Sequence, residues 1–126
     1  MNDKPSFDYL DQFVFCGLCF QKLELTENGF SCPYGCLSFL SASAIEQVIW
    51  GEMGRLLQKP KFRKIAERHL REKLTQPQII HIFENLRNFL EFIPETEKER
   101  FALAMIEKVD ILSPESIEIR FRGKKP

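Results

Sequence analysis

The stretch FVFCGLCFQKLELTENGFSCPYGCLSFLS, residues 13–41, decides the fold of this 126-residue chain. It contains all four cysteines of the sequence, Cys16, Cys19, Cys32 and Cys36, as a C-x2-C pair and a C-x3-C pair separated by twelve residues. Paired cysteines at this spacing are typical of a tetrahedral zinc site, because each tight turn offers two thiolates to one metal ion. The sequence therefore predicts one Zn2+ ion held by these four side chains.

The residues between the two cysteine pairs predict an antiparallel β-ribbon that brings the pairs together. Short aromatic or alternating runs occupy residues 13–15 and 20–25, and the Asn28-Gly29 pair favours a tight turn before Phe30. Because all four ligands are thiolates, the coordination shell is closed and leaves no position for water or a substrate. We therefore expect a structural metal that stabilises a ribbon too small to have much core of its own.

Two disulfides, or inert buried thiols, are the alternative interpretations of the cysteines. The N-terminal segment MNDKPSFDYLDQF has neither the basic nor the apolar region of a signal peptide, so we expect a cytoplasmic protein, in which disulfides are rare. No apolar run approaches the ~18 residues that a membrane span needs, so no membrane partner is expected. Zinc is thus the favoured interpretation.

Downstream of the cysteines, apolar residues recur at helical spacing and predict four helices. Capping boxes and prolines mark where these helices begin. The predicted helices are 43–58, which begins with the capping box Ser43–Glu46; a second that Pro60 opens; a third from the capping box Thr75–Gln78 to Ile93; and a fourth from the capping box Thr96–Glu99 to residue 108.

The C-terminal residues predict a closing pair of strands. Residues 109–112 and 116–122 alternate apolar and charged side chains on either side of a Ser113-Pro114 turn. We predict an α+β fold, in which a small zinc ribbon is followed by a helical hairpin or bundle and a closing β-hairpin. Residues 1–126 form a single domain in this prediction, with the ribbon at 1–40, the helices at 41–108 and the closing strands at 109–126.

The charges balance overall but are distributed unevenly along the chain. Lys and Arg number 18, as do Asp and Glu, so the net charge is zero and gives no global argument for binding nucleic acid. The first 36 residues are acidic, whereas two later stretches are basic and could contact DNA phosphates. A solvated helix face is the alternative interpretation. The candidate DNA-binding residues are Lys59, Lys61, Arg63, Lys64, Arg68, Arg71, Lys73, Arg120, Arg122, Lys124 and Lys125.

Six segments of the chain have the order and character of a known region. They are Phe15–Cys19, Phe30–Cys32, Ser41–Trp50, Glu97–Phe101, Met105–Val109 and Ile117–Arg122. Together they resemble the zinc β-ribbon C-terminal region of the large serine recombinases, the site-specific integrases and resolvases. In that family a zinc ribbon is followed directly by a helix, and a last helix and strands close the region.

The resemblance implies a role in binding double-stranded DNA during site-specific recombination. It brings no catalytic domain, because no segment here matches the family's nucleophilic serine and arginine cluster, so we expect no enzyme activity. Only residues 58–95 stand where family members commonly carry a long coiled-coil arm, which leaves room for a short hairpin only. A role for this hairpin in synapsis is therefore not implied.

Two functions from different classes are consistent with these features. The first is a non-catalytic zinc-ribbon DNA-binding module that belongs to, or is accessory to, a large serine recombinase. The alternative is a protein-interaction adaptor that binds and regulates a recombinase catalytic subunit, or another protein, without contacting DNA. A folded remnant of a mobile element is a third interpretation. Neither a Gly-rich phosphate loop nor a Ser-His-Asp arrangement is present, so no small-molecule substrate is expected.

Overall fold

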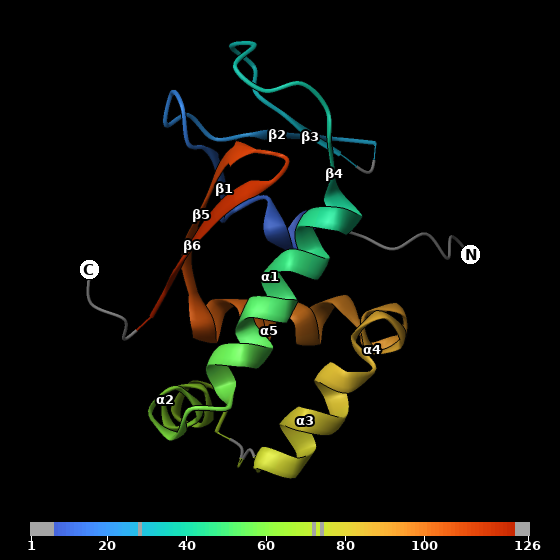
Figure 1. Cartoon of the computed structure of the whole chain (residues 1–126), viewed down its shortest axis with the longest axis vertical. Helices are drawn as coiled ribbons and strands as arrows, with labels where there is room; N and C mark the ends of the chain where they lie inside the picture. The colour runs from blue at the N-terminus through green and yellow to red at the C-terminus, as the bar shows by residue number, and fades with distance from the viewer. Residues whose placement is uncertain (1–6, 28, 72, 74, 123–126) are drawn as a thin grey trace.

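The computed structural model describes residues 7–27, 29–71, 73 and 75–122, and this part of the chain has an α+β fold (Figure 1). The predicted fold class is confirmed. No helix within the described ranges is both long and apolar enough to cross a bilayer. The elements in chain order are η1 (Asp8–Leu10), β1 (Val14–Cys16), β2 (Glu24–Thr26), β3 (Gly29–Ser31), β4 (Leu40–Ser41), α1 (Ala42–Leu57), α2 (Pro60–Leu70), α3 (Gln76–Glu84), α4 (Leu86–Phe92), α5 (Glu95–Met105), β5 (Ile106–Ser113) and β6 (Ser116–Phe121).

The predicted ribbon is formed by β2, β3 and β4. Strands β2 and β3 pair antiparallel, with Leu25 opposite Phe30, and β4 adds to the other side of β3, with Leu40 opposite Phe30. Asn28, the predicted turn residue, lies outside the described residues. Phe30 is fully buried, because it points from the central strand into the core. Phe30 and Leu40 are the large apolar side chains that these three strands bury, so the ribbon depends on other interactions for the remainder of its stability.

The second sheet joins the two ends of the chain, which the sequence did not predict. Its strand order is β1-β5-β6, with β1 parallel to β5 and β5 antiparallel to β6. Val14 pairs with Val109 and Cys16 pairs with Ile111, so the strand that carries the first cysteine is hydrogen-bonded to the closing hairpin. This pairing attaches the cysteine-containing segment to residues almost one hundred positions later in the sequence.

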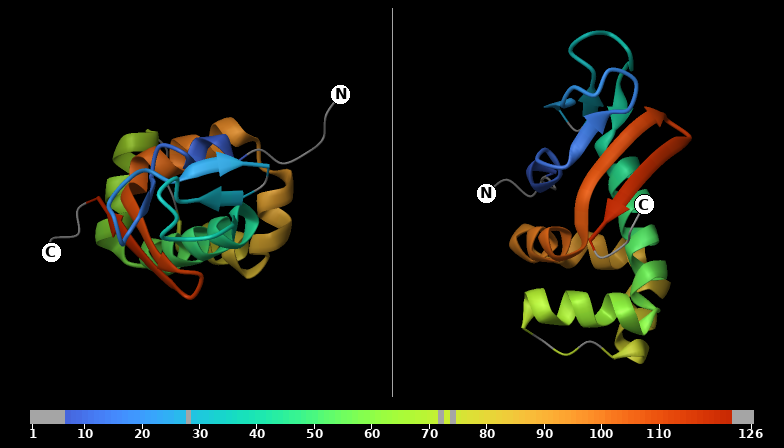
Figure 2. Two further views of the ribbon diagram at one scale, coloured as in Figure 1. Left: turned by 90° about the horizontal axis from the view of Figure 1, so that it is seen from above. Right: turned by 90° about the vertical axis from the view of Figure 1, so that its left-hand side faces the viewer.

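Helix α1 connects the ribbon with the helical end of the molecule (Figure 2). It begins at Ala42, where the Ser41 hydroxyl accepts a hydrogen bond from the Ala44 N–H (3.3 Å). The predicted capping box Ser43–Glu46 is wrong, because Glu46 is buried in the core and contacts other elements rather than the helix end.

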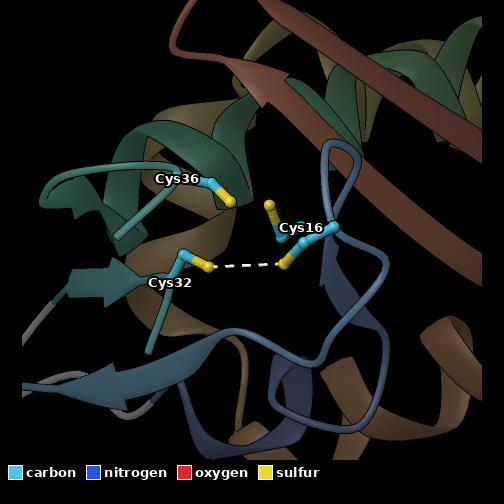
Figure 3. Close-up of side chains that lie close together, drawn as sticks. Cys16, Cys32 and Cys36 are labelled. Carbon is cyan, nitrogen blue, oxygen red and sulfur yellow. Dashed lines mark hydrogen bonds between the residues drawn. The ribbon is translucent and has the colours of Figure 1, made fainter. Parts of the chain in front are cut away.

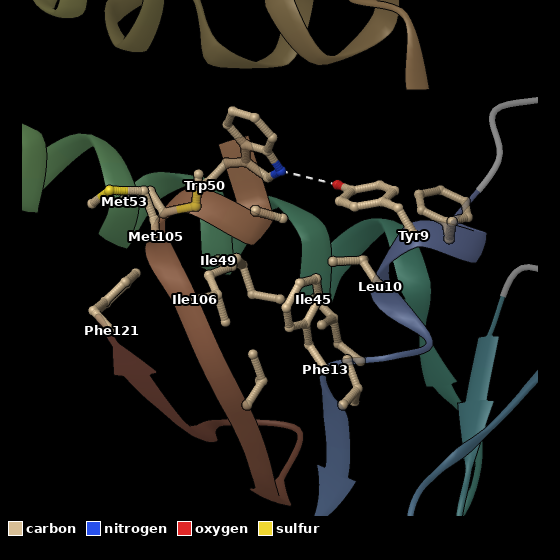
Figure 4. Packing of buried hydrophobic residues seen from close by; sticks show 14 of the residues in the cluster. Tyr9, Leu10, Phe13, Ile45, Ile49, Trp50, Met53, Met105, Ile106 and Phe121 are labelled. Atoms are coloured by element: carbon tan, nitrogen blue, oxygen red, sulfur yellow. Dashed lines mark hydrogen bonds between the residues drawn. The ribbon is translucent and has the colours of Figure 1, made fainter. Parts of the chain in front are cut away.

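The core forms where one face of α1 meets η1, α5 and the β1-β5-β6 sheet. Side chains from all of these elements interdigitate around α1 (Figure 4). Trp50 is 1% exposed, as expected for an aromatic residue at helical spacing. The labelled members of this core are Tyr9, Leu10, Phe13, Ile45, Ile49, Trp50, Met53, Met105, Ile106 and Phe121.

The third predicted helix is divided into two. The capping box at Thr75 is confirmed: its hydroxyl accepts from the Gln78 N–H and the Gln78 side chain accepts from the Thr75 N–H. However, α3 ends at Glu84, and Asn85 has non-helical angles (φ −119°, ψ 42°) before α4 begins. The Asn85 side chain donates to the carbonyl of His81 (3.5 Å), which illustrates how asparagine competes with helical backbone bonds.

Both ends of the fourth predicted helix differ from the prediction. Helix α5 begins at Glu95 with Pro94 as its N-cap and no side-chain cap, so the predicted capping box Thr96–Glu99 is wrong. The helix ends at Met105, and β5 begins at Ile106 rather than at residue 109. A register irregularity between Ile106 and Lys108 allows Ile106 and Val109 to be buried together in a strand. Their spacing of three residues had suggested a continuing helix.

Gly54 permits the close approach of α3 to α1. A Cβ atom on Gly54 would overlap the ring of Phe83. We expect Gly54→Val to lower the melting temperature by several degrees, because Phe83 would have to leave its packed position. Thermal unfolding followed by circular dichroism measures the change. Gly51→Val is the matched control, since a Cβ on Gly51 meets no heavy atom within 4 Å; equal destabilisation by both variants would contradict the packing argument.

Candidate metal centre

The first cysteine pair lies in a tight turn at the end of β1. The Cys16 N–H donates to the Gln21 carbonyl (2.8 Å), and the Phe20 N–H donates to the Cys16 carbonyl (2.8 Å). Phe20 has φ 64°, in the left-handed region that non-glycine residues rarely adopt. The Gly17 N–H also donates to the Ile111 carbonyl in β5 (2.7 Å). These bonds fix the turn both internally and against the second sheet.

The second cysteine pair lies in a turn that follows β3. The Gly35 N–H donates to the Cys32 carbonyl (3.0 Å), and Gly35 has φ 80°, which glycine adopts without strain. The Tyr34 N–H points at the Cys32 sulfur, with a distance of 3.4 Å between N and Sγ. A backbone donor directed at sulfur stabilises the thiolate form of that cysteine.

The two turns bring the four sulfur atoms together. All four Sγ atoms lie within 4.8 Å of one another, and the Cys19 and Cys32 sulfurs are 3.6 Å apart. Cys16, on the first turn, and Cys32 and Cys36, on the second, direct their sulfurs towards a common centre (Figure 3). All four are free thiols, so the predicted alternative of two disulfides is not what the structure contains. Four sulfur donors at these distances can hold a metal ion.

The thiol pKa values differ within this cluster. Burial opposes ionisation of Cys32, but hydrogen bonds from the backbone N–H groups of Tyr34 and Cys36 outweigh burial and lower its pKa to about 6. The hydrogen bond with the Cys19 side chain is the main cause that raises the pKa of Cys36 to about 12. Thiolates this close repel one another, and a cation among the sulfurs would offset this repulsion.

The basic residues of α2 are mostly solvent-exposed. Arg63 is the exception: its guanidinium donates to the Leu57 carbonyl (3.2 Å) and the Gln58 carbonyl (2.7 Å) at the end of α1. Arg63 therefore satisfies the last carbonyls of a helix. The exposed members of the predicted set in this stretch are Lys59, Lys61, Lys64, Arg68, Arg71 and Lys73.

The C-terminal basic residues have different surroundings. Arg120 is exposed on β6, whereas the Arg122 Nε donates to the Leu103 carbonyl (2.7 Å) near the end of α5. Lys124 and Lys125 lie outside the described residues. Helix α5 lies between α2 and the β5-β6 hairpin (Figures 1 and 2), so the two basic stretches belong to separate layers of the fold. That these residues contact DNA stays a prediction.

A buried polar cluster around Glu46 lies in the core and was not predicted from the sequence. The Tyr9 hydroxyl donates to the Glu46 carboxylate (2.6 Å) and accepts from the Trp50 indole N–H (2.9 Å). The Lys98 ammonium lies 3.1 Å from the same carboxylate oxygen, and both charged side chains are about 5% exposed. Burial, followed by the adjacent Glu46 charge, raises the pKa of Tyr9. No local signal identifies such a cluster, because its members are up to 89 residues apart in the sequence.

Large apolar side chains are exposed on the two cysteine turns. Leu18 is 53% exposed, Phe20 is 70% exposed and Tyr34 is 71% exposed. Phe92, on α4, is also exposed, at 83%. No family model, no curated protein and no solved structure matches this chain in sequence or fold.

Proposed function

We propose that this chain is a zinc-ribbon module without catalytic activity that binds double-stranded DNA, as part of or accessory to a large serine recombinase. The observation that carries the DNA-binding proposal is the spacing of exposed basic side chains on α2. They stand at intervals of three and four residues, which places them on one side of the helix. The residues of this stripe are Lys61, Lys64 and Arg68; Arg71 follows the end of α2 in a left-handed conformation (φ 57°) and is not part of the stripe.

The opposite side of α2 supports this interpretation because it is apolar and buried. Phe62, Ala66 and Leu70 pack into the core and hold the helix in place, while the basic stripe faces solvent. The stripe extends for about 10 Å along the helix at 1.5 Å per residue. Basic side chains at this density can neutralise several phosphates of a duplex, and phosphate neutralisation supplies most of the affinity in sequence-independent binding.

Zinc is the metal that we propose for the four-cysteine cluster. A tetrahedral Zn2+ ion with Zn–S bonds of about 2.3 Å separates its sulfur ligands by about 3.8 Å. The observed Sγ atoms, all within 4.8 Å of one another, need only small shifts to reach this geometry. The ion would stabilise the ribbon, while the role in recombination is supported by the sequence resemblance.

The test is binding of the zinc-loaded protein to mixed-sequence duplex DNA across a salt series, followed by fluorescence anisotropy. We expect the logarithm of the affinity to fall linearly with the logarithm of salt concentration. Lys61→Ala, Lys64→Ala and Arg68→Ala should each reduce the magnitude of the slope by about 0.9, which is the contribution of one phosphate contact. Arg63 is left unchanged because it caps α1.

Arg55→Ala is the control for nonspecific charge effects. Arg55 is exposed, pairs with Glu52 (3.3 Å) and belongs to α1 rather than to the stripe on α2. If Arg55→Ala lowers the slope as much as the stripe variants do, the proposed contact surface is wrong. If no binding occurs at about 50 mM salt, the stripe is only a solvated helix face.

A protein-interaction adaptor is the second candidate, and the exposed side chains on the cysteine turns favour it. Leu18, Phe20 and Tyr34 are apolar, more than half exposed, and carried by the two cysteine turns, which belong to the acidic first 36 residues of the chain. Acidic surfaces disfavour DNA but suit a basic protein partner. Binding to a recombinase catalytic subunit that persists in Lys61→Ala and Lys64→Ala but is lost in Phe20→Ser would support this function.

A further inference from the structure

Strand β6 forms an open edge of the β1-β5-β6 sheet. It is hydrogen-bonded to β5 on one side, and in the described part of the chain no strand pairs with its other side. The opposite edge, β1, differs because Phe15 forms a bridge with Lys22. An open strand edge presents unpaired N–H and C=O groups and is a template for pairing with another strand.

The two faces of β6 have different character. Ile117, Ile119 and Phe121 turn towards α1 and the core, with Phe121 buried. Glu118 and Arg120 lie on the other face and are exposed. Apolar and charged residues therefore alternate strictly along β6. A strand that pairs with it must place its own apolar residues on the core face of the sheet and its charged residues on the other face.

The charges on β6 are not matched by β5. Glu118 stands opposite Asp110, and Arg120 stands opposite Lys108, so each of these cross-strand pairs consists of two residues with the same charge. Lys108 and Asp110 instead form an ion pair with each other (3.4 Å), and Lys108 also lies over the Phe15 ring. Among the described residues neither Glu118 nor Arg120 has an ion-pair partner. Like charges directly opposite each other destabilise a sheet, so counter-charges are needed from the open side.

We propose that β6 pairs antiparallel with β6 of a second copy of this chain, about a two-fold axis at Ile119. In this register, Glu118 of one copy stands opposite Arg120 of the other, and Arg120 opposite Glu118, so both mismatched charges gain a partner. Ile117 of each copy stands opposite Phe121 of the other on the apolar face. The two sheets become one continuous sheet. The proposal is independent of the proposed DNA binding.

A hollow beside β6 fits the apolar side of this arrangement. It has a volume of about 350 Å3 and lies between α1 and β6, with Val48, Glu52, Pro114 and the apolar side chains of β6 in its lining. Val48, on α1, is 43% exposed. An added strand would place its own isoleucine and phenylalanine side chains at this side of the sheet and cover Val48.

The test is sedimentation equilibrium of the zinc-loaded full chain from about 1 µM to about 1 mM, because one pair of edge strands makes a small interface and a weak dimer. We expect a monomer–dimer equilibrium for the natural sequence. E118R and R120E should each raise the dimer dissociation constant about tenfold or more, because two symmetry-related pairs become repulsive. Neither variant should lower the melting temperature, because each one removes a like-charge pair with β5.

Combining the two charge reversals tests whether Glu118 and Arg120 stand opposite each other in the dimer. The double variant E118R/R120E restores both opposite-charge pairs and should dimerise as well as the natural chain does. A mixture of the E118R and R120E proteins should form heterodimers that neither forms alone. E99R, at an exposed position of α5, should leave the dissociation constant unchanged. A natural chain that is monomeric over the whole range, or a dimer indifferent to E118R and R120E, would overturn the proposal.

Discussion

Replacing Cys32 by serine is expected to abolish stoichiometric zinc binding and to unfold the ribbon formed by β2, β3 and β4. Cys32 is 6% exposed and follows the central strand of this ribbon, so its replacement removes both a metal ligand and the fixed point of the second turn. Structural zinc contributes on the order of 10 kcal/mol to the folding of small metal domains, far more than the small ribbon core can supply. Zinc content and hydrogen exchange of the ribbon amides measure the two effects.

The effect of losing the metal should also reach the C-terminal strands. The turn that carries Cys16 is hydrogen-bonded to Ile111 in β5 through Gly17. Chelation of the metal should therefore increase amide exchange in β5 as well as in the ribbon, while α3 and α4 remain protected. Protection of β5 that does not change on chelation would show that the two sheets are stabilised independently.

Tyr34→Ser is the matched control for Cys32→Ser. Tyr34 lies in the same turn, but its side chain is 71% exposed and only its backbone N–H approaches the cysteine sulfur. This variant should retain one equivalent of zinc and a folded ribbon. Less than half an equivalent of zinc in freshly purified, reduced natural protein would contradict a structural zinc site altogether.

The second large effect is expected from Lys98→Met, which should lower the free energy of unfolding by about 3–5 kcal/mol. The substitution leaves the Glu46 carboxylate buried, with the Tyr9 hydroxyl as its remaining hydrogen-bond donor. An uncompensated buried charge costs far more than the packing that methionine provides. Urea denaturation measures the loss as a lower midpoint, because the surface exposed on unfolding changes little.

The double variant Glu46→Met, Lys98→Met separates charge from packing. It removes both charges, so it should recover much of the stability lost in the single variant, although the Tyr9 hydroxyl loses its acceptor. Lys64→Met is the control, since Lys64 is exposed on α2 and its loss should change stability by less than about 0.5 kcal/mol. A single Lys98→Met variant as stable as the control would show that the buried pair contributes nothing.

The cysteine cluster could be predicted because its signal is local. Two residues separated by two or three positions must share a tight turn, and a hairpin of twelve residues can only return the second turn towards the first. The capping box at Thr75 was predicted correctly for the same reason, since both of its hydrogen bonds lie within four residues. The fold class also followed from hydrophobic periodicity, which short segments reveal by themselves.

Predictions failed where distant contacts decided between local alternatives. Ser41 and Ser43 can both cap α1, and the structure uses Ser41 because Glu46 is held in the core by Lys98, 52 residues later. Ile106 and Val109 fit a helix by spacing, but pairing with β1 and β6 makes them part of a bulged strand.

The sequence by itself determined the four-cysteine cluster, the antiparallel ribbon and the position of the basic stripe on α2. Each of these depends on residues that are close in the chain, so their geometry follows from the backbone rules of turns and helices. Only the tertiary structure decided that β1 pairs with β5, that Glu46 meets Lys98 in the core, and that Glu118 and Arg120 face like charges beside an open edge. These features arise from pairings between segments far apart in the chain, and local patterning leaves the partner and the register of such pairings undetermined.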